Sequence, residues 1–213
     1  MKEGELVLIG YTGRAEGEIF DTTDEDVAKE NSIDREDAEL KPVPVLIGRE
    51  YIIEGLEEKL YDMEVGDKQE VTVPAEKGYG KRSSDNIATY PEKEFQKQGV
   101  EVRPGEELMI GQRRGKVVSK GSGRVRIDFN HPLAGKELEY DLEVLEKVED
   151  DKEIAEHIYG YRIGHGDIDI EDGTVKIPST HSHGDHDHEL PEEVRDMLRE
   201  EIEEATSLDV EFV

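Results

Sequence analysis

Short apolar runs with the spacing of β-strands recur along almost the whole chain. Residues 6–9 form a continuous apolar run, and apolar side chains alternate with other residues over 43–47 and 138–144. Alternation of this kind places one face of a strand in a core. Helical spacing is confined to a few stretches, including 53–60 and the segment after Pro191. The pattern predicts an α+β protein built mainly from short strands.

The chain is strongly acidic, with 55 acidic and 27 basic residues among 213 and a net charge of −28. Low hydrophobicity with high net charge is typical of disordered chains, but the recurring strand-type runs argue against disorder. The alternative is a folded protein with an acidic surface, as in salt-loving organisms, because molar salt shortens the Debye length to about 3 Å and screens self-repulsion. We favour this halophilic interpretation.

Composition also argues against several classes of function. The chain has no cysteine, which rules out disulfides, thiolate metal sites and cysteine nucleophiles. No apolar run approaches the roughly 20 residues that span a bilayer, and residues 1–5 lack the apolar segment of a signal peptide. A charge this negative also disfavours binding to nucleic acid. We therefore expect a soluble cytoplasmic protein with no membrane or nucleic-acid partner.

The charge is distributed unevenly along the chain. Residues 81–128 contain 11 basic and 7 acidic side chains, a net charge of +4, whereas 1–80 together with 129–149 carry −17 and 150–213 carry −15. The basic zone therefore interrupts two acidic pieces. Apolar periodicity predicts that 150–213 form a small α+β unit with a hairpin and two helices.

Several short motifs occur in order along the first two thirds of the chain. They are Phe20-Asp21, Gly48, Ile52-Ile53-Glu54-Gly55-Leu56-Glu57, Met63-Glu64-Val65-Gly66-Asp67, Gly78-Tyr79-Gly80 and Asp128-Phe129-Asn130-His131-Pro132-Leu133-Ala134-Gly135-Lys136. Together they resemble the FKBP-type peptidyl-prolyl isomerases, and the last is similar to the return segment of the SlyD-like branch. The resemblance covers residues 1–149.

The resemblance implies a specific domain organisation. Residues 1–80 and 129–149 would form an FKBP-like antiparallel half-barrel wrapped on a short helix. Residues 81–128, the basic zone, would be the inserted, small β-rich insert-in-flap domain, which in relatives binds unfolded polypeptide as a chaperone. Residues 150–213 look like the extra C-terminal domain of long archaeal members, which fits a halophilic archaeon. Relatives with such an extension can dimerise through it, so a homodimer is an open expectation.

Prolyl isomerisation requires a particular kind of pocket. The reaction breaks no covalent bond but crosses a rotational barrier of about 18–20 kcal/mol set by amide resonance. Apolar and aromatic walls with a few oriented hydrogen bonds favour the twisted transition state, so no cofactor, nucleophile or obligatory metal is expected. By resemblance, the pocket would be formed by Tyr11, Phe20, Ile53, Leu56, Tyr79, Phe129, Leu133 and Tyr140, with Asp21 at its rim.

The same resemblance gives some of these residues roles. Asp21 would orient its neighbours and interact with the twisted amide, the Tyr79 hydroxyl would donate to a substrate carbonyl, and the Ile53 N–H would bind another. Composition alone favours a plain barrel-core role for Ile53 and Phe20. Leu56 stands where many single-domain relatives carry Trp. His131 would either border the site or be a surface turn residue.

The basic insert contains more apolar residues than so small a domain would expose by accident. Some must form its core, and the rest are candidates for binding unfolded chains: Ile87, Phe95, Val100, Leu108, Met109 and Ile110. Its basic residues would attract acidic clients, namely Arg113, Arg114, Lys116, Arg124 and Arg126. A nucleic-acid role is disfavoured because no aromatic stacking platform accompanies them.

A histidine-rich segment, residues 181–188, is the sharpest local feature elsewhere. It holds four of the seven histidines together with two carboxylates. Imidazole binds nickel, zinc and copper well, and SlyD-like bacterial proteins bind nickel through a histidine-rich tail. The alternative is a solvated loop before the helix at Pro191. The candidate ligands for nickel or zinc are His181, His183, Asp185, His186 and His188.

Taken together, the sequence predicts a peptidyl-prolyl cis-trans isomerase that accelerates proline-limited folding steps. Its partners would be unfolded or partly folded polypeptides with X-Pro bonds, captured by the insert and passed to the isomerase pocket. The alternatives are a holdase whose pocket is catalytically idle, and a metal-binding accessory protein that uses the histidine-rich segment.

Overall fold

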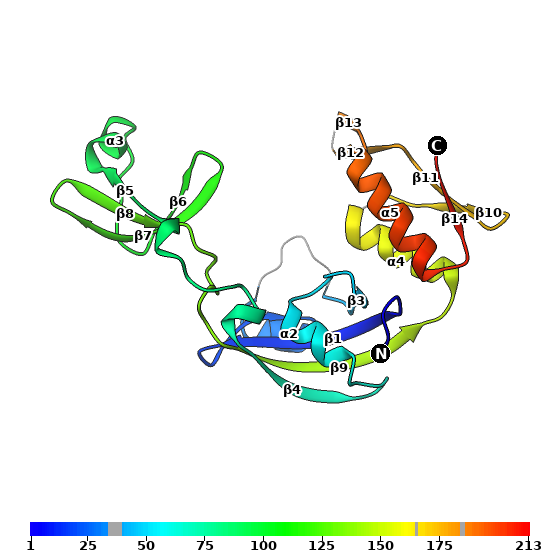
Figure 1. The fold of residues 1–213 in the computed structure, drawn as a ribbon. Coiled ribbons are helices and arrows are strands. Elements are labelled where there is room, and N and C mark those ends of the chain that lie inside the picture. The colour runs from blue at the N-terminus through cyan, green and yellow to red at the C-terminus, as the bar shows by residue number, and fades with distance from the viewer. Residues whose placement is uncertain (34–39, 165, 184–185) are drawn as a thin grey trace. The chain divides into compact units, whose positions relative to one another are not determined.

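The computed structural model describes residues 1–33, 40–164, 166–183 and 186–213, and of residues 181–183 and 186–188 it describes the backbone alone. The chain divides into two compact units (Figure 1). One unit joins Met1–Val73 to Glu139–Val213, and the other is Pro74–Leu138. Each unit has its own sheets and its own buried side chains, so each is described by itself.

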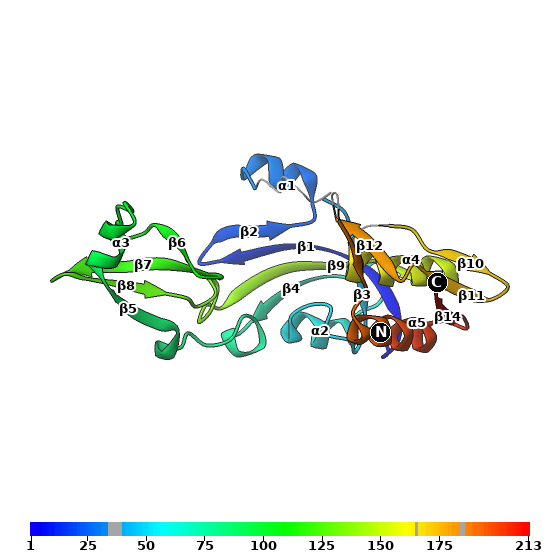
Figure 2. The same ribbon diagram turned by 90° about the horizontal axis from the view of Figure 1, so that it is seen from above.

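The larger unit contains a five-stranded sheet of order β2-β1-β9-β4, in which β3 also pairs with β1. Strand β1 runs antiparallel to both β2 and β3. The sheet is strongly bent, and Figure 2 shows its long strands side by side. The strands are β1 (Leu6–Ala15), β2 (Glu18–Thr22), β3 (Val43–Leu46), β4 (Lys68–Val73) and β9 (Leu138–Val148).

A short helix, α2 (Glu54–Leu60), covers the concave side of this sheet (Figure 1). Alternate residues of β9 are buried from Leu138 onward, as the period-two pattern predicts. Helix α2 buries Leu56 and Leu60, and it approaches β4 so closely that a Cβ on Gly55 would lie 2.6 Å from Val73. A bent antiparallel sheet wrapped on a short helix is the predicted fold, and it is confirmed.

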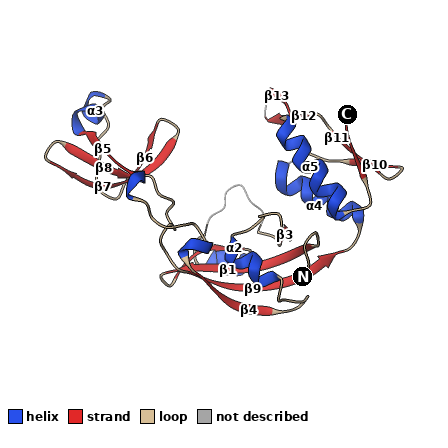
Figure 3. Ribbon diagram, viewed as in Figure 1, coloured by secondary structure: helices blue, strands red, loops and turns tan. Residues whose placement is uncertain are grey.

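The C-terminal part of the same unit packs two helices beside a small sheet (Figure 3). In the sheet of order β10-β11-β14, β11 pairs antiparallel with β10 and parallel with β14. Ile158 of α4 and Leu198 and Ile202 of α5 are fully buried. The elements are α4 (Asp151–Ile163), β10 (Asp169–Glu171), β11 (Thr174–Ile177), α5 (Glu192–Ala205) and β14 (Asp209–Phe212). Helix α1 (Glu25–Glu30) follows β2.

The histidine-rich segment forms a hairpin. Strands β12 (Thr180–His183) and β13 (His186–Glu189) pair antiparallel, so the alternative of a solvated loop is wrong for the backbone of these residues. The reason is that pairing of the two arms satisfies backbone groups that a loop would leave to water.

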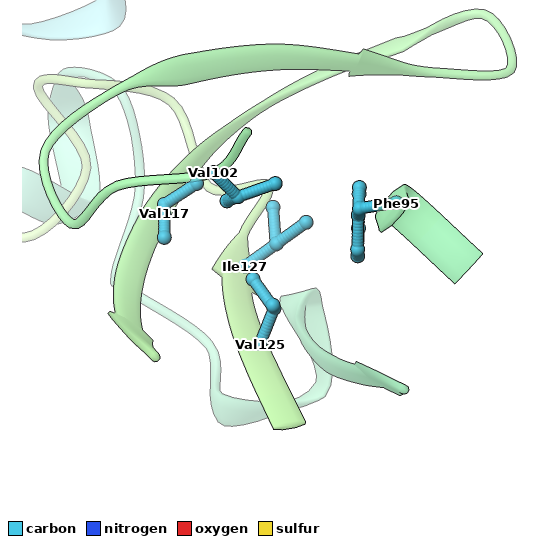
Figure 4. Close-up of a cluster of buried hydrophobic side chains, with 5 residues drawn as sticks. All are labelled: Phe95, Val102, Val117, Val125 and Ile127. Atoms are coloured by element: carbon cyan, nitrogen blue, oxygen red, sulfur yellow. The ribbon is translucent and has the colours of Figure 1, made fainter. Parts of the chain in front are cut away.

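The smaller unit carries a four-stranded sheet of order β5-β8-β7-β6 and a short helix, α3. Its core consists of Phe95, Val102, Val117, Val125 and Ile127 (Figure 4). The elements are two short 3-10 helices, η1 (Ala75–Lys77) and η2 (Ser84–Asn86), then β5 (Ile87–Pro91), α3 (Glu92–Lys97), β6 (Glu107–Ile110), β7 (Arg113–Gly121) and β8 (Arg124–Asp128).

The smaller unit extends beyond residues 81–128 on both sides. Its two connecting segments bond to each other, because the Gly135 N–H donates to the Gly80 carbonyl at 2.8 Å and the Ser83 N–H to Asn130 Oδ1 at 2.9 Å. These bonds tie the segment around Tyr79 to the insert. The predicted division into isomerase domain, insert and C-terminal domain stays a prediction. Within the described ranges, no helix has the length and apolar character needed to cross a membrane.

Candidate active site

Three aromatic rings of the larger unit meet edge to face. The ring centroids of Tyr11 and Tyr140 are 5.9 Å apart at 68°, and those of Phe20 and Tyr140 are 5.8 Å apart at 89°. Edge-to-face pairs at this separation are favoured by the ring quadrupoles. Tyr140 is buried on the inward face of β9, while β1 and β2 supply the other two rings. The structure thus gathers three of the predicted pocket residues into one aromatic cluster.

Gly13 makes this cluster possible. A Cβ at this position would lie 2.8 Å from the Phe20 ring and 2.8 Å from the Tyr140 ring. Gly13 also precedes the point where the β1–β2 register shifts. Gly13 was not among the predicted site residues, although a glycine in the middle of a strand is a known signal of close approach by other groups.

Asp21 lies at the same place and its carboxylate is held in a fixed orientation. The Tyr11 hydroxyl donates a hydrogen bond of 2.7 Å to Asp21 Oδ2. The register of the two strands places Gly13 opposite Asp21. The neighbouring Thr12 and Thr22 hydroxyls are also bonded, 2.8 Å apart and buried. A half-buried carboxylate fixed beside an aromatic cluster can interact electrostatically with the dipole of an amide that binds against the rings.

Ile53 and Leu56 lie at the start of α2 in the same unit. Ile53 is the N-cap residue, and its carbonyl accepts hydrogen bonds from the Leu56 and Glu57 N–H groups. Among the described residues, none accepts a hydrogen bond from the Ile53 N–H. Leu56 is 3% exposed and is held close to the sheet by Gly55. The predicted donor N–H is therefore present on a fixed turn.

The smaller unit holds the remaining predicted pocket residues. The rings of Tyr79 and His131 stack 4.2 Å apart and nearly parallel, at 2°. His131 Nδ1 accepts a hydrogen bond of 3.2 Å from the Leu133 N–H. The structure therefore brings His131 to Tyr79, which is 37% exposed, and Leu133 bonds to His131 in the following turn. His131 is exposed next to a turn as well as stacked on Tyr79, so both alternatives for it, bordering the site and being a surface turn residue, stay open.

Phe129 is placed differently from its neighbours in the motif. It packs on the core of the insert, 6.4 Å from the Tyr90 ring, and the Arg113 guanidinium lies 4.5 Å from its centroid. These contacts make Phe129 part of the packing of the smaller unit, and its predicted place in the pocket wall stays a prediction.

Some apolar residues of the insert lie in its core, and others lie on its surface. Phe95 is core, and Leu108 and Ile110 are partly buried against it. Met109, between them on β6, is 61% exposed, and Val100 is also exposed. Ile87 is half-buried at the start of β5. The alternation along β6 therefore leaves Met109 on the surface.

A hollow of about 980 Å³ lies in the same unit. Val118 and Phe129 contribute apolar surface, and His131 and Pro132 line it as well. Its charged lining residues are four basic and two acidic: Arg82, Arg114, Lys116, Lys136, Glu107 and Asp128. The hollow therefore reaches from the insert's strands to the segment that stacks on Tyr79.

Comparison with known proteins shows the family to which the chain belongs. A model of the FKBP-type peptidyl-prolyl cis-trans isomerases matches residues 1–110, about half of the chain. The chain belongs to this family. A model of the FKBP26 IF domain matches residues 90–133, within the smaller unit.

Individual relatives agree with the family match. The FKBP-type chain is 37% identical over 144 residues to the short-type peptidyl-prolyl cis-trans isomerase of Methanocaldococcus jannaschii, covering 68% of this chain and 92% of that one. It is 28% identical over 161 residues to SlyD of Helicobacter pylori, covering 72% and 79%. SlyD of Haemophilus influenzae is 37% identical over 127 residues, covering 56% and 66%. The predicted resemblance to SlyD-like FKBP proteins is confirmed.

The predicted metal ligands fall mostly on the β12–β13 hairpin. Its backbone register places His181 opposite His188 and His183 opposite His186. Asp185 lies outside the described residues. Elsewhere in the described part of this FKBP-type chain, no group of three or more His, Asp or Glu side chains is arranged to hold a metal ion.

Proposed function

We propose that this FKBP-type isomerase uses the aromatic cluster of Tyr11, Phe20 and Tyr140, with Asp21 beside it, to accelerate isomerisation of X-Pro bonds in unfolded chains. The observation that carries the proposal is the Tyr11–Asp21 hydrogen bond at the edge of three packed rings. Apolar walls withdraw the prolyl amide from water, which otherwise stabilises the planar, resonant form. The twisted transition state of the amide is then stabilised relative to the planar ground state.

Two further groups are proposed to hold the substrate. The Ile53 N–H, without an acceptor among the described residues, is a donor for one substrate carbonyl. The Tyr79 hydroxyl is proposed as a donor to a second one, with His131 stacked on the Tyr79 ring. Oriented donors of this kind cost no reorganisation when the amide twists.

The insert is proposed to bind clients as a chaperone. Three observations support this: the exposed Met109, the exposed Val118, and the 980 Å³ hollow with its basic residues. Methionine adapts its shape to varied partners. Because the hollow includes Pro132 and His131, an extended client segment on the insert reaches the side of Tyr79 without leaving the smaller unit.

The function is tested by refolding a protein whose folding is limited by a proline bond. Uncatalysed, such a step takes tens to hundreds of seconds. In molar salt, a catalytic amount of the wild-type chain should shorten the slow phase, and Tyr11→Phe should shorten it less. If aggregation is suppressed but the slow phase is unchanged at every concentration, the chain is a holdase and the isomerase proposal is wrong.

Metal binding by the β12–β13 hairpin is a second candidate function. The register pairs all four histidines across the hairpin at alternate positions of both strands, so the four residues share one face. Histidine is a residue type that binds nickel and zinc well, and the backbone register brings four of them to neighbouring positions. Calorimetric titration of the full chain with each metal, against a variant with all four histidines replaced by Ala, tests it. Equal heats for both proteins would exclude this site.

A homodimer through the C-terminal part is proposed from the sheet β10-β11-β14. Strand β14 is at its edge, where strands commonly pair with a second chain, although its Val210 N–H already donates to Glu203 Oε1 at 3.3 Å. Light scattering of the full chain in molar salt should give the mass of two copies. A single-copy mass over the whole concentration range would contradict this.

A further inference from the structure

The loop between β3 and α2, residues 47–53, is held by helices α4 and α5. The Tyr51 side chain is 4% exposed. Its ring stacks on the Tyr161 ring with centroids 4.4 Å apart at 20°, and the Arg162 guanidinium lies 4.2 Å above its centroid. The Tyr51 hydroxyl donates a hydrogen bond of 2.7 Å to Glu201 Oε2. A residue of the isomerase fold is thus packed between two helices of the C-terminal part.

The charges in this contact are fully paired. Glu201 is 3% exposed, and its two carboxylate oxygens accept bonds from Arg162, one of them from Nε at 3.0 Å. Burial and the hydrogen bond to Glu201 raise the pKa of Tyr51, so its hydroxyl keeps its proton. Removing one partner of a buried ion pair leaves the other uncompensated, so the three side chains depend on one another.

The same helices also bond the backbone of the loop. The Tyr161 hydroxyl donates to the Tyr51 carbonyl at 2.5 Å, and Arg162 Nη2 donates to the Arg49 carbonyl at 3.3 Å. The Arg49 side chain pairs with Glu200 on α5 at 2.9 Å. One residue separates Tyr51 from Ile53. The backbone leading to the Ile53 N–H is therefore fixed from the C-terminal part.

We infer that Tyr51, Arg162 and Glu201 are positioning residues, through which helices α4 and α5 set the placement of the Ile53 N–H for catalysis. The inference rests on the proposed function, since it takes that N–H as a substrate donor. A donor gains its effect from its position, and a misplacement of about 1 Å costs up to about a hundredfold in rate. The C-terminal part would thus contribute to catalysis without touching the substrate.

The test uses the full chain and three variants. Glu201→Gln removes the buried charge, Tyr51→Phe removes one oxygen from a stacked ring, and Glu193→Gln alters an exposed acid on the same helix as a control. We expect kcat/KM for a prolyl peptide in molar salt to fall about tenfold for Glu201→Gln and several-fold for Tyr51→Phe. Glu193→Gln should match wild type.

Amide NMR spectra give a second readout that is independent of activity. The Ile53 amide signal should shift in Glu201→Gln and Tyr51→Phe, while that of Val117 in the insert should not. If the wild type is active and both variants keep its kcat/KM, the inference is wrong. If Glu201→Gln does not fold, Tyr51→Phe decides in the same way. An inactive wild type overturns the proposed function alone, and the Ile53 signal then decides: a shift supports the positioning contact and no shift refutes it.

Discussion

The Tyr11 hydroxyl donates a 2.7 Å hydrogen bond to Oδ2 of Asp21, across the antiparallel pair of β1 and β2. The bond fixes a carboxylate at the edge of a cluster in which Tyr140 meets Tyr11 and Phe20 edge to face. A fixed charge beside an apolar surface acts on the changing dipole of a twisting amide. Removing the bond should therefore affect catalysis more than folding.

Tyr11→Phe is expected to lower kcat/KM for a prolyl peptide by about tenfold, because the Asp21 carboxylate loses the hydrogen bond that fixes its orientation. The free energy of unfolding should fall by less than about 1.5 kcal/mol. Tyr61→Phe alters a surface tyrosine and should change neither quantity. An unchanged rate in Tyr11→Phe would show that the bond has no catalytic role.

Gly13→Ala is expected to disrupt the aromatic cluster. The new Cβ would lie 2.8 Å from both the Phe20 and the Tyr140 rings, so one ring must move. Overpacking of this kind costs about 1–3 kcal/mol, and kcat/KM should fall as well. Gly10→Ala in the same strand is the control, since its nearest neighbour would be 3.4 Å away. Urea unfolding compares the two; equal stabilities would contradict the close approach at Gly13.

Asp128 should make the stability depend on pH. Burial raises the pKa of Asp128, but the hydrogen bonds from Asn130 and the charge of Arg82 outweigh burial and lower it. The native state then binds fewer protons than the unfolded state near the ordinary aspartate pKa of about 3.9. The stabilisation is present above that value and is lost as pH falls through the lower native pKa.

Asp128→Asn should accordingly cost about 1–3 kcal/mol of unfolding free energy at neutral pH. The difference from wild type should shrink as the medium is made acidic. Asp85→Asn, at an exposed position of the same unit, should cost little. A difference that grows on acidification would contradict the lowered pKa of Asp128 in the native state.

The acidic surface predicts a dependence on salt. With a net charge of −28, self-repulsion destabilises the compact state, and molar salt screens it. The melting temperature should rise steadily from millimolar to molar potassium chloride. A melting temperature that is flat or falls over this range would contradict the halophilic interpretation.

Client binding should be separable from catalysis. Met109→Gln combined with Val118→Thr removes two exposed apolar side chains from the insert. Suppression of aggregation should weaken, while kcat/KM for a short prolyl peptide should stay at the wild-type value. Val65→Thr, an exposed valine of the larger unit, is the control. Undiminished suppression of aggregation would place client binding outside these two residues, and an equal loss of both activities would contradict their separability.

Period-two alternation and ordered motifs predicted much of the fold from sequence. They identified β9, helix α2 and the β10–β11 hairpin, because each pattern reports local burial along one element. The cluster of Tyr11, Phe20 and Asp21 was expected from the family resemblance. Gly13 was missed because its role depends on two rings that come from other strands.

Contacts between residues far apart in the sequence could not be predicted from local patterns. Nothing local in Tyr51 or Glu201 indicates that they meet, since they are 150 residues apart and join through Arg162. Phe129 belongs to a family motif, yet its contacts are with Tyr90 and Arg113 of the insert. The side-by-side histidines of β12 and β13 likewise depend on a hairpin register that alternation alone did not reveal.

The most direct test is NMR exchange spectroscopy on a short prolyl peptide with substoichiometric wild-type chain in molar salt. We expect cis–trans exchange peaks with the wild type, and an exchange rate about tenfold lower with Tyr11→Phe. Exchange at the uncatalysed rate in the presence of folded wild-type chain would contradict this expectation.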